Sequence, residues 1–282
     1  TIVEPPYRTL PSSNHVDVGF SNGDKVSCPA RLVCRIVSWG ENPWRGQSRP
    51  AADAPHAVTG SNASVRSITS SWNAFAALHD DGSISAWGAP ASCASPPVTV
   101  TVPSSPVLSI ASAKNAFAAI HADGSVSVWG DPSGGGADAP SSVTSPTSPV
   151  ARIASAQSAF AAIHEDGSVS VWGDPSGGGA NAPSSVTSPS SPVAKIASAH
   201  NAFAAIHQDG SVSGWGASYL ANAPSSVTSP TSPVVSIASL PKAMAAIHTD
   251  GSVSIWGAGA NAPSSVTTPT SPVVSITSTN DD

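Results

Sequence analysis

The sequence predicts an all-β fold in which small antiparallel sheets of three to four strands are stacked as the blades of a β-propeller. Two dipeptides carry this prediction: Asp-Gly recurs every 41 to 43 residues, and Trp-Gly follows each copy six residues later. A fixed period of this length is typical of a repeat architecture. The repeated residues are Asp81, Asp123, Asp166, Asp209 and Asp250, the glycines that follow them (Gly82, Gly124, Gly167, Gly210 and Gly251), and Trp87, Trp129, Trp172, Trp215 and Trp256.

Each unit of the repeat contains three runs of residues that suit short strands. In the best-formed unit these runs cover residues 107–112, 116–121 and 125–130. A further, degenerate copy ends at Trp39, so that six units are countable. We therefore expect a divergent N-terminal segment with a degenerate first blade in residues 1–60, and repeats that close one propeller with it in residues 61–282.

The second and third strands of a unit are predicted to pair as a hairpin around the loop Ala122-Asp123-Gly124. A three-residue loop of this kind is a type I turn closed by a residue in the left-handed region, which glycine adopts without strain. This loop sets Phe117 opposite Trp129 on one face of the sheet. A two-residue loop would scatter these groups, because a shift of one residue moves side chains to the other face.

Both faces of the hairpin carry apolar or small residues, so both must be covered. The face opposite the aromatic pair carries Ala118, Ile120, Val126 and Val128. Neighbouring sheets about 10 Å apart supply that cover, and they give a propeller if the array closes. We expect the linkers, such as residues 131–149, to cross each blade on the outside, with residues 141–144 as a short outer strand.

The two ends of the chain predict how the array closes. Residues 273–278 resemble a first strand with no hairpin after it, whereas the unit ending at Trp39 has no recognisable first strand before it. Pairing of the two would close a ring of six blades and leave no open edge. Seven blades or a truncated longer array are the alternatives.

Composition and charge restrict the class of partner. A net charge of −6 and scattered basic residues argue against a nucleic-acid partner, because a phosphate-binding surface needs clustered Lys and Arg. No apolar run reaches the roughly 20 residues of a transmembrane segment. Thr1 follows no Met, which suggests a processed N-terminus and an organelle lumen or extracytoplasmic compartment. Cys28 and Cys34 are close enough to close a small loop, but whether they are bonded stays open.

Catalytic, metal and cofactor chemistry have no clear motif. No Gly-x-Ser-x-Gly nucleophile turn occurs, and the glycine runs 134–136 and 177–179 lack the Lys that follows in a phosphate loop. Five histidines recur at equivalent positions, but sheets about 10 Å apart hold them too far apart to share one ion. We expect each imidazole to be hydrogen-bonded at a strand end, and we predict no catalytic residue, metal or cofactor. These histidines are His79, His121, His164, His207 and His248.

If the repeated residues form the scaffold, recognition is expected where the units differ. The turn between the first and second strands differs in every unit, and its residues mix an aromatic ring, cations and amides as interfaces do. The predicted partner-binding residues are Trp72, Asn73, Lys114, Gln157, His200 and Lys242 in these turns, Tyr219 in an altered linker, and Trp44 and Arg45 in the N-terminal segment.

This pattern favours a non-catalytic, protein-binding scaffold that acts as a subunit or accessory factor of a larger assembly. A carbohydrate-binding module is the alternative, because exposed Trp and Tyr with amides suit sugar faces. A catalytic propeller is a distant third, since a fold by itself does not exclude catalysis.

The repeated motifs also resemble a known family. Ile-Ala-Ser, Ala-Phe-Ala-Ala-Ile-His, Asp-Gly-Ser-Val and Trp-Gly-Asp are similar to repeats of the RCC1-like family, over residues 65–278. The resemblance implies a propeller, usually of seven blades, that serves as a protein-binding platform. The units here are shorter and no exchange-factor loop matches, so exchange activity is not implied. The Ala-Phe-Ala-Ala variant is also similar to proteins of algal sources, which implies a membrane-bound assembly as partner.

Overall fold

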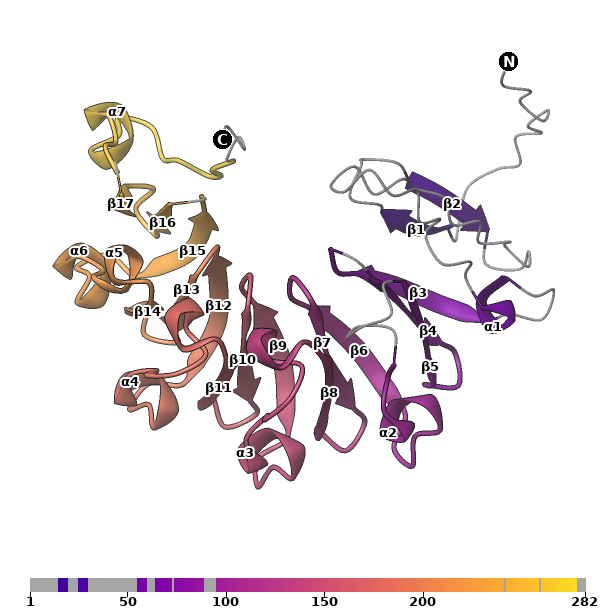
Figure 1. Cartoon of the computed structure of the whole chain (residues 1–282). Coiled ribbons are helices and arrows are strands. Elements are labelled where there is room, and N and C mark those ends of the chain that lie inside the picture. The colour runs from indigo at the N-terminus through magenta and orange to yellow at the C-terminus, as the bar shows by residue number, and fades with distance from the viewer. Residues whose placement is uncertain are drawn as a thin grey trace, which may run out of the picture.

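The fold is an open arc of five three-stranded antiparallel sheets that follow one another along the chain (Figure 1). The computed structural model describes residues 15–19, 25–29, 55–59, 64–72, 74–88, 95–240, 242–258 and 260–277. A two-stranded sheet of β1 (His15–Gly19) and β2 (Lys25–Pro29) lies near the first of the five. The five sheets are β3 (Val65–Ser70), β4 (Ala74–His79) and β5 (Ile84–Gly88); β6 (Val107–Ser112), β7 (Ala116–His121) and β8 (Val126–Gly130); β9 (Val150–Ser155), β10 (Ala159–His164) and β11 (Val169–Gly173); β12 (Val193–Ala199), β13 (Ala202–His207) and β14 (Val212–Gly216); and β15 (Val234–Ser239), β16 (Ala243–His248) and β17 (Val253–Gly257).

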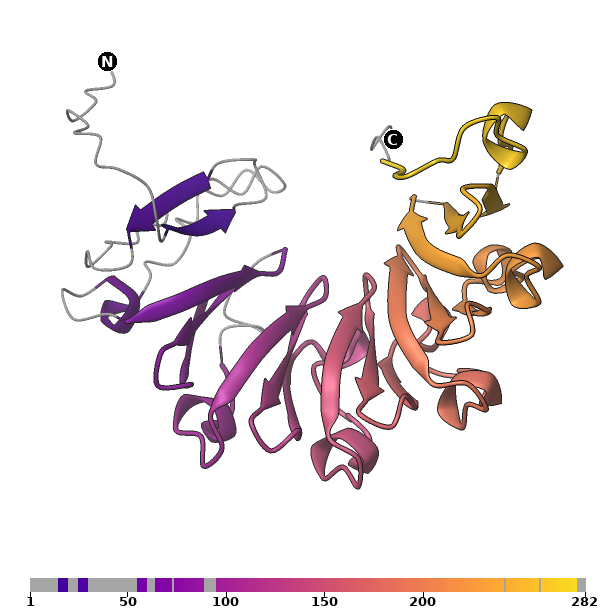
Figure 2. The same ribbon diagram turned by 180° about the vertical axis from the view of Figure 1, so that it is seen from behind.

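The strands have a constant order from the inside of the arc to the outside. In each sheet the second strand lies between the first and the third. The first strands β3, β6, β9, β12 and β15 line the concave side, and the linkers with their helical turns lie on the outer rim (Figures 1 and 2). The predicted blade of three antiparallel strands is confirmed.

The predicted hairpin register is also confirmed. Phe117 pairs with Trp129, and the His121 amide donates to the Ser125 carbonyl over 2.9 Å, which closes the three-residue loop. Gly124 has a φ of +79°, and a Cβ atom there would lie 2.3 Å from the Cβ of Pro149 in the next linker. Glycine is therefore needed at this position both for its backbone conformation and for the close approach of the next unit.

A bulge in the first strand was not predicted. The register of β6 against β7 shifts between Val107 and Ser109, and equivalent shifts occur in the other four sheets. The extra residue leaves Leu108 and Ser109 both exposed, instead of one facing each neighbouring sheet. The bulge therefore supplies each unit with two consecutive side chains on the concave side.

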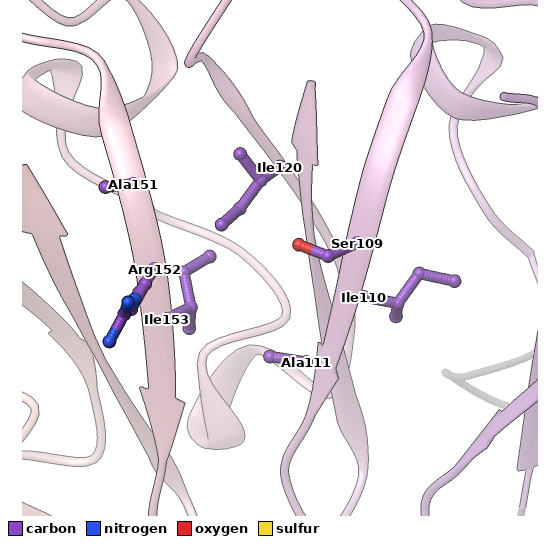
Figure 3. Close-up of a pocket in the computed structure, with 7 residues that line it drawn as sticks. All are labelled: Ser109, Ile110, Ala111, Ile120, Ala151, Arg152 and Ile153. Carbon is purple, nitrogen blue, oxygen red and sulfur yellow. The ribbon is translucent and has the colours of Figure 1, made fainter. Parts of the chain in front are cut away.

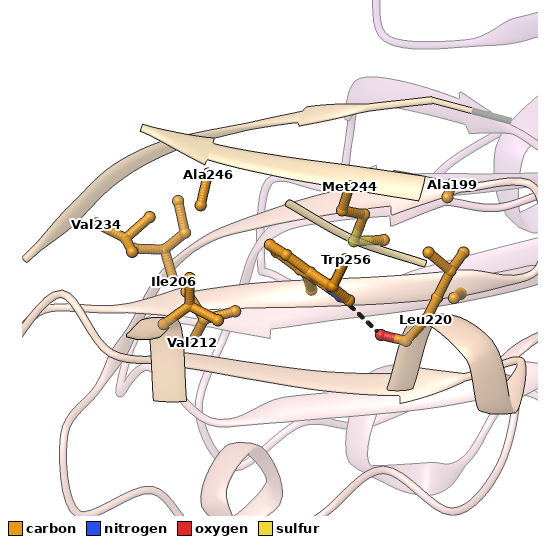
Figure 4. Packing of buried hydrophobic residues seen from close by; sticks show 11 residues of the cluster. Ala199, Ile206, Val212, Leu220, Val234, Met244, Ala246 and Trp256 are labelled. Atoms are coloured by element: carbon orange, nitrogen blue, oxygen red, sulfur yellow. Dashed lines mark hydrogen bonds between the residues drawn. The ribbon is translucent and has the colours of Figure 1, made fainter. Parts of the chain in front are cut away.

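The core consists of the spaces between neighbouring sheets. Phe117 and Trp129 are stacked, with ring centroids 5.1 Å apart, and they pack against Leu78 and Ile84 of the preceding sheet. The opposite face of the same sheet contacts Phe160 and its partner in the next sheet. In the fifth sheet Met244 replaces the phenylalanine and contacts Trp256, as Figure 4 shows. Both faces of an inner sheet are thus buried, as the sequence predicts.

The prediction of an outer strand at residues 141–144 is wrong. The segment is a single helical turn, α3 (Ser141–Thr144), in which the amides of Val143 and Thr144 donate to the Pro140 carbonyl. The physical reason is the side-chain pattern: one helical turn buries Val143 completely and leaves its three polar neighbours exposed. Other short turns are α1 (His56–Thr59), α2 (Val98–Thr101), α4 (Ser184–Thr187), α5 (Ser218–Ala221), α6 (Ser225–Thr228), α7 (Ser264–Thr267), η1 (Pro132–Gly134) and η2 (Pro175–Gly177).

Closure of the predicted ring of six blades is not seen within the described residues. Residues 273–277 lie in no sheet, and both views show them apart from β1 and β2 (Figures 1 and 2). The Val273 amide donates to the Gly251 carbonyl over 3.0 Å, as Val234 does to Gly210 in the preceding unit. Beyond that bond no second strand within the described residues pairs with this segment, so nothing there holds it as a strand. The unit that ends at Trp39 lies outside the described residues.

Candidate functional site

The variable turns between first and second strands are joined into a row along one edge of the arc. The Trp72 amide donates to the Lys114 carbonyl over 3.0 Å, and the Lys114 amide donates to the Gln157 carbonyl over 2.8 Å. The Gln157 amide in turn donates to the His200 carbonyl over 2.9 Å. We call Trp72, Lys114, Gln157 and His200 the first-turn row. Four of the predicted partner-binding residues are therefore neighbours in space.

The turns leave their central side chains free to vary. In the second sheet the Ala113 amide donates to the Ala116 carbonyl over 2.9 Å, which closes the turn, and both alanines are buried. The same bond joins Ala156 to Ala159 in the third sheet. Because small buried residues and backbone bonds hold the turn, the first of its two central residues can differ from unit to unit.

Trp72 and Lys114 form the most distinctive contact in the first-turn row. The Trp72 side chain is 68% exposed, and the Lys114 Nζ atom lies 4.3 Å from the centroid of its ring. A cation at this distance is attracted by the electron-rich face of the indole. The pair therefore presents an ordered apolar ring beside a positive charge at the surface.

The structure describes the remaining predicted partner-binding residues only in part. Lys242 is exposed in the equivalent turn of the fifth sheet. Tyr219 lies in α5, but its side chain is outside what the structure describes, as are Asn73, Trp44 and Arg45. Their roles stay predictions.

The opposite edge of the arc carries the Asp-Gly turns. The Asp123 Oδ1 atom accepts from the Ser125 amide over 3.0 Å and from the Ser125 hydroxyl over 2.6 Å. The hydrogen bond from the Ser125 hydroxyl is the larger cause, and the bond from the Ser125 amide adds to it; together they hold the pKa of Asp123 below its ordinary value. The same arrangement lowers the pKa of the other four aspartates, Asp81, Asp166, Asp209 and Asp250.

The repeated histidines are part of the scaffold. His121 is 5% exposed; its Nε2 atom lies 2.8 Å from the Ser127 hydroxyl and its Nδ1 atom 2.7 Å from the Ser105 carbonyl oxygen. His164, His207 and His248 make the same two contacts. The expected hydrogen-bonded imidazole is found in these units. Among the residues that the structure describes, no three His, Cys, Asp or Glu side chains come together as metal ligands.

Sequence reasoning missed the concave side of the arc. Arg152 in β9 and Lys195 in β12 are exposed there, on adjacent sheets. The signal was present in the sequence, because the equivalent residue is serine in the other three sheets: Ser67, Ser109 and Ser236. The position was overlooked because simple strand alternation places it on a buried face, and only the bulge exposes it.

Comparison with solved structures identifies the fold. Prp20p from Saccharomyces cerevisiae, described with its binding to Gsp1p and histones, is 14% identical over 81% of this chain and 67% of Prp20p, with a TM-score of 0.50. Yeast RCC1 (Prp20) bound to Kap60 is 13% identical over 91% of this chain and 71% of that chain, with a TM-score of 0.48. Human WBSCR16 is 15% identical over 68% of this chain and 61% of that chain, with a TM-score of 0.47. No protein-family model and no curated protein sequence matches the chain.

The likeness to Prp20p and the repeated three-stranded sheets show that the chain has an RCC1-like propeller-repeat fold. At 14% identity this likeness concerns the fold alone. None of the helices in the described part of the chain has the length and apolar character needed to cross a bilayer.

Proposed function

We propose that this chain is a non-catalytic scaffold that binds a protein partner through the first-turn row. The observation that carries the proposal is the ladder of backbone hydrogen bonds from Trp72 to His200, which holds four variable side chains in fixed order. A rigid row that presents an aromatic ring, a cation, an amide and an imidazole suits a protein interface, where Trp and charged groups act as anchors.

The pairing of Trp72 with Lys114 favours a protein over a carbohydrate. A sugar-binding tryptophan needs an open ring face for stacking, and the Lys114 Nζ atom, 4.3 Å from the centre of this ring, occupies one of the two faces. A protein partner gains from the same pair, because the apolar ring and the charge give contact area and specificity together.

The fold comparison supports a binding role without naming a partner. Prp20p, which shares the fold, is described with binding to Gsp1p and histones. Nothing in the first-turn row assigns those partners to this chain. The proposal is therefore a protein-binding platform whose partner is to be found by experiment.

Capture from the native source tests the proposal. The immobilised chain should retain a partner that the Trp72→Ala variant loses or binds at least tenfold more weakly. Val98→Ala is the matched control, because Val98 is also a large exposed side chain but lies on the outer rim. Equal capture by all three chains would contradict the proposal. Binding to a glycan array that depends on Trp72 would support the carbohydrate alternative instead.

A further inference from the structure

Two cavities open on the concave side of the arc, one on each side of β9. The first has a volume of about 280 Å³ and lies between β6 and β9, where Ser109, Ile120 and Ile153 line it (Figure 3). The second has a volume of about 220 Å³ and lies between β9 and β12, with Arg152, Ile163 and Lys195 among its lining residues. The two cavities share Arg152 and Ile153, so a ligand that crosses β9 would contact both.

The two cavities differ in chemistry because strand pairing directs neighbouring side chains to opposite faces of β9. Ile153 pairs with Ala162, whereas Arg152 pairs with Ile163. Figure 3 shows Ile153 directed toward the first cavity and the Arg152 side chain on the other side of the strand. The first cavity is therefore mainly aliphatic, with Arg152 in the part of the lining that it shares with the second, and the second combines an aliphatic floor with the positive charges of Arg152 and Lys195.

The charge of the second cavity is not balanced by the described part of the chain. Arg152 and Lys195 are exposed and form no ion pair there, whereas Arg66 at the N-terminal end pairs with Asp80 over 3.7 Å. No residue that lines either cavity is acidic. The chain as a whole has a net charge of −6, so this cavity differs in sign from the rest of the molecule. Its two cations complement a ligand that carries carboxylates.

We propose that the concave side binds an extended acidic peptide segment across β9. An aliphatic side chain of the peptide occupies the cavity beside Ile120 and Ile153, and a carboxylate lies by Arg152 and Lys195. Neighbouring sheets are about 10 Å apart and an extended chain rises about 3.3 Å per residue, so the aliphatic and acidic residues are about three positions apart.

A peptide fits these observations better than a sulfated or phosphorylated polymer. Polyanions are held by many cations along a track, and here only two cations lie together. The isoleucines that line both cavities would be left without apolar contacts by such a polymer.

Fluorescence anisotropy with the full chain tests the site. The probe is a fluorescein-labelled peptide of the sequence Gly-Ser-Leu-Ser-Ser-Glu-Glu-Ser-Gly, which places the first Glu three residues after Leu. We expect saturable binding that weakens as salt is added, and at least a fivefold loss of affinity in Arg152→Glu and in Lys195→Glu. Peptides with Gln in place of Glu, or with Ser in place of Leu, should each bind at least threefold more weakly.

Ser141→Glu is the control, because it adds a negative charge at an exposed position of α3 on the outer rim, away from the cavities. We expect its affinity for the peptide to stay within twofold of the parent. The proposal is overturned if no saturation is reached below about 1 mM peptide. It is also overturned if Ser141→Glu loses as much affinity as Arg152→Glu, or if heparin binds through Arg152 and excludes the peptide. Because Trp72 lies outside both cavities, Trp72→Ala should bind the peptide normally even if it fails to capture the partner of the first-turn row.

Discussion

The spaces between sheets and the first-turn row contain the same residue types in opposite settings. Trp172 is 3% exposed between two sheets, whereas Trp72 is 68% exposed in the row. His121 is buried with two hydrogen-bond partners, whereas His200 is exposed. The difference shows that position in the repeat, and not residue type, separates the residues that form the scaffold from those available for recognition.

The two tryptophans should give the largest contrast. Trp172 stacks on Phe160 with ring centroids 5.3 Å apart, and its Nε1 atom donates to the Gly135 carbonyl over 3.1 Å. Trp172→Ala should lower the free energy of unfolding by about 3–5 kcal/mol, because it leaves a cavity between two sheets. Trp72→Ala should change it by less than about 0.5 kcal/mol. Denaturant melts measure both, and comparable losses would show that the row is part of the core.

The histidines should give the next largest contrast. His121→Ala should cost about 2 kcal/mol, because it removes two hydrogen bonds and leaves the Ser105 carbonyl without its imidazole partner. His200→Ala, the control, should stay within about 0.5 kcal/mol of the parent in the same melts. A silent His121→Ala would mean that water replaces the imidazole at no cost.

The Asp-Gly turns predict a dependence of stability on pH. The pKa of Asp166 is lowered from 3.8 by the Ser168 hydroxyl and amide, so the folded state favours the charged form. Its contribution to stability is complete above that unfolded value and is lost as the pH falls through the lower folded pKa. Asp166→Asn should be less stable than the parent at pH 7 and should approach it near pH 2, by thermal melts across this range. A constant difference at every pH would exclude the charge as the cause.

The smallest expected effect concerns Lys114, whose contact with Trp72 is fully at the surface. Lys114→Met keeps an apolar side chain of similar length but removes the charge that lies over the ring. We expect the free energy of unfolding to change by less than about 0.5 kcal/mol, because exposed cation–π pairs contribute little. Partner capture should fall by less than in Trp72→Ala. A larger loss than in Trp72→Ala would make the charge, and not the ring, the main anchor.

The interior of each unit was predictable because it depends on local chemistry. A loop of Ala122, Asp123 and Gly124 allows one turn geometry, and period-two alternation then places Phe117 beside Trp129. The same reasoning failed at residues 141–144, where one buried valine among polar residues suits a helical turn as well as an edge strand. Short segments of this kind carry too little periodicity to separate the two.

The sequence by itself determined the repeat, the hairpin register and the turns in which the units differ, because the repeat is visible as a fixed period and the register follows from contacts within one hairpin. Only the tertiary structure decided how those units meet. Backbone bonds between Trp72, Lys114, Gln157 and His200 turn separate loops into one row, and the bulges bring Arg152 and Lys195 to the concave side. The open form of the described arc was also decided there, because a segment such as residues 273–277 forms a strand only where a partner strand meets its backbone groups.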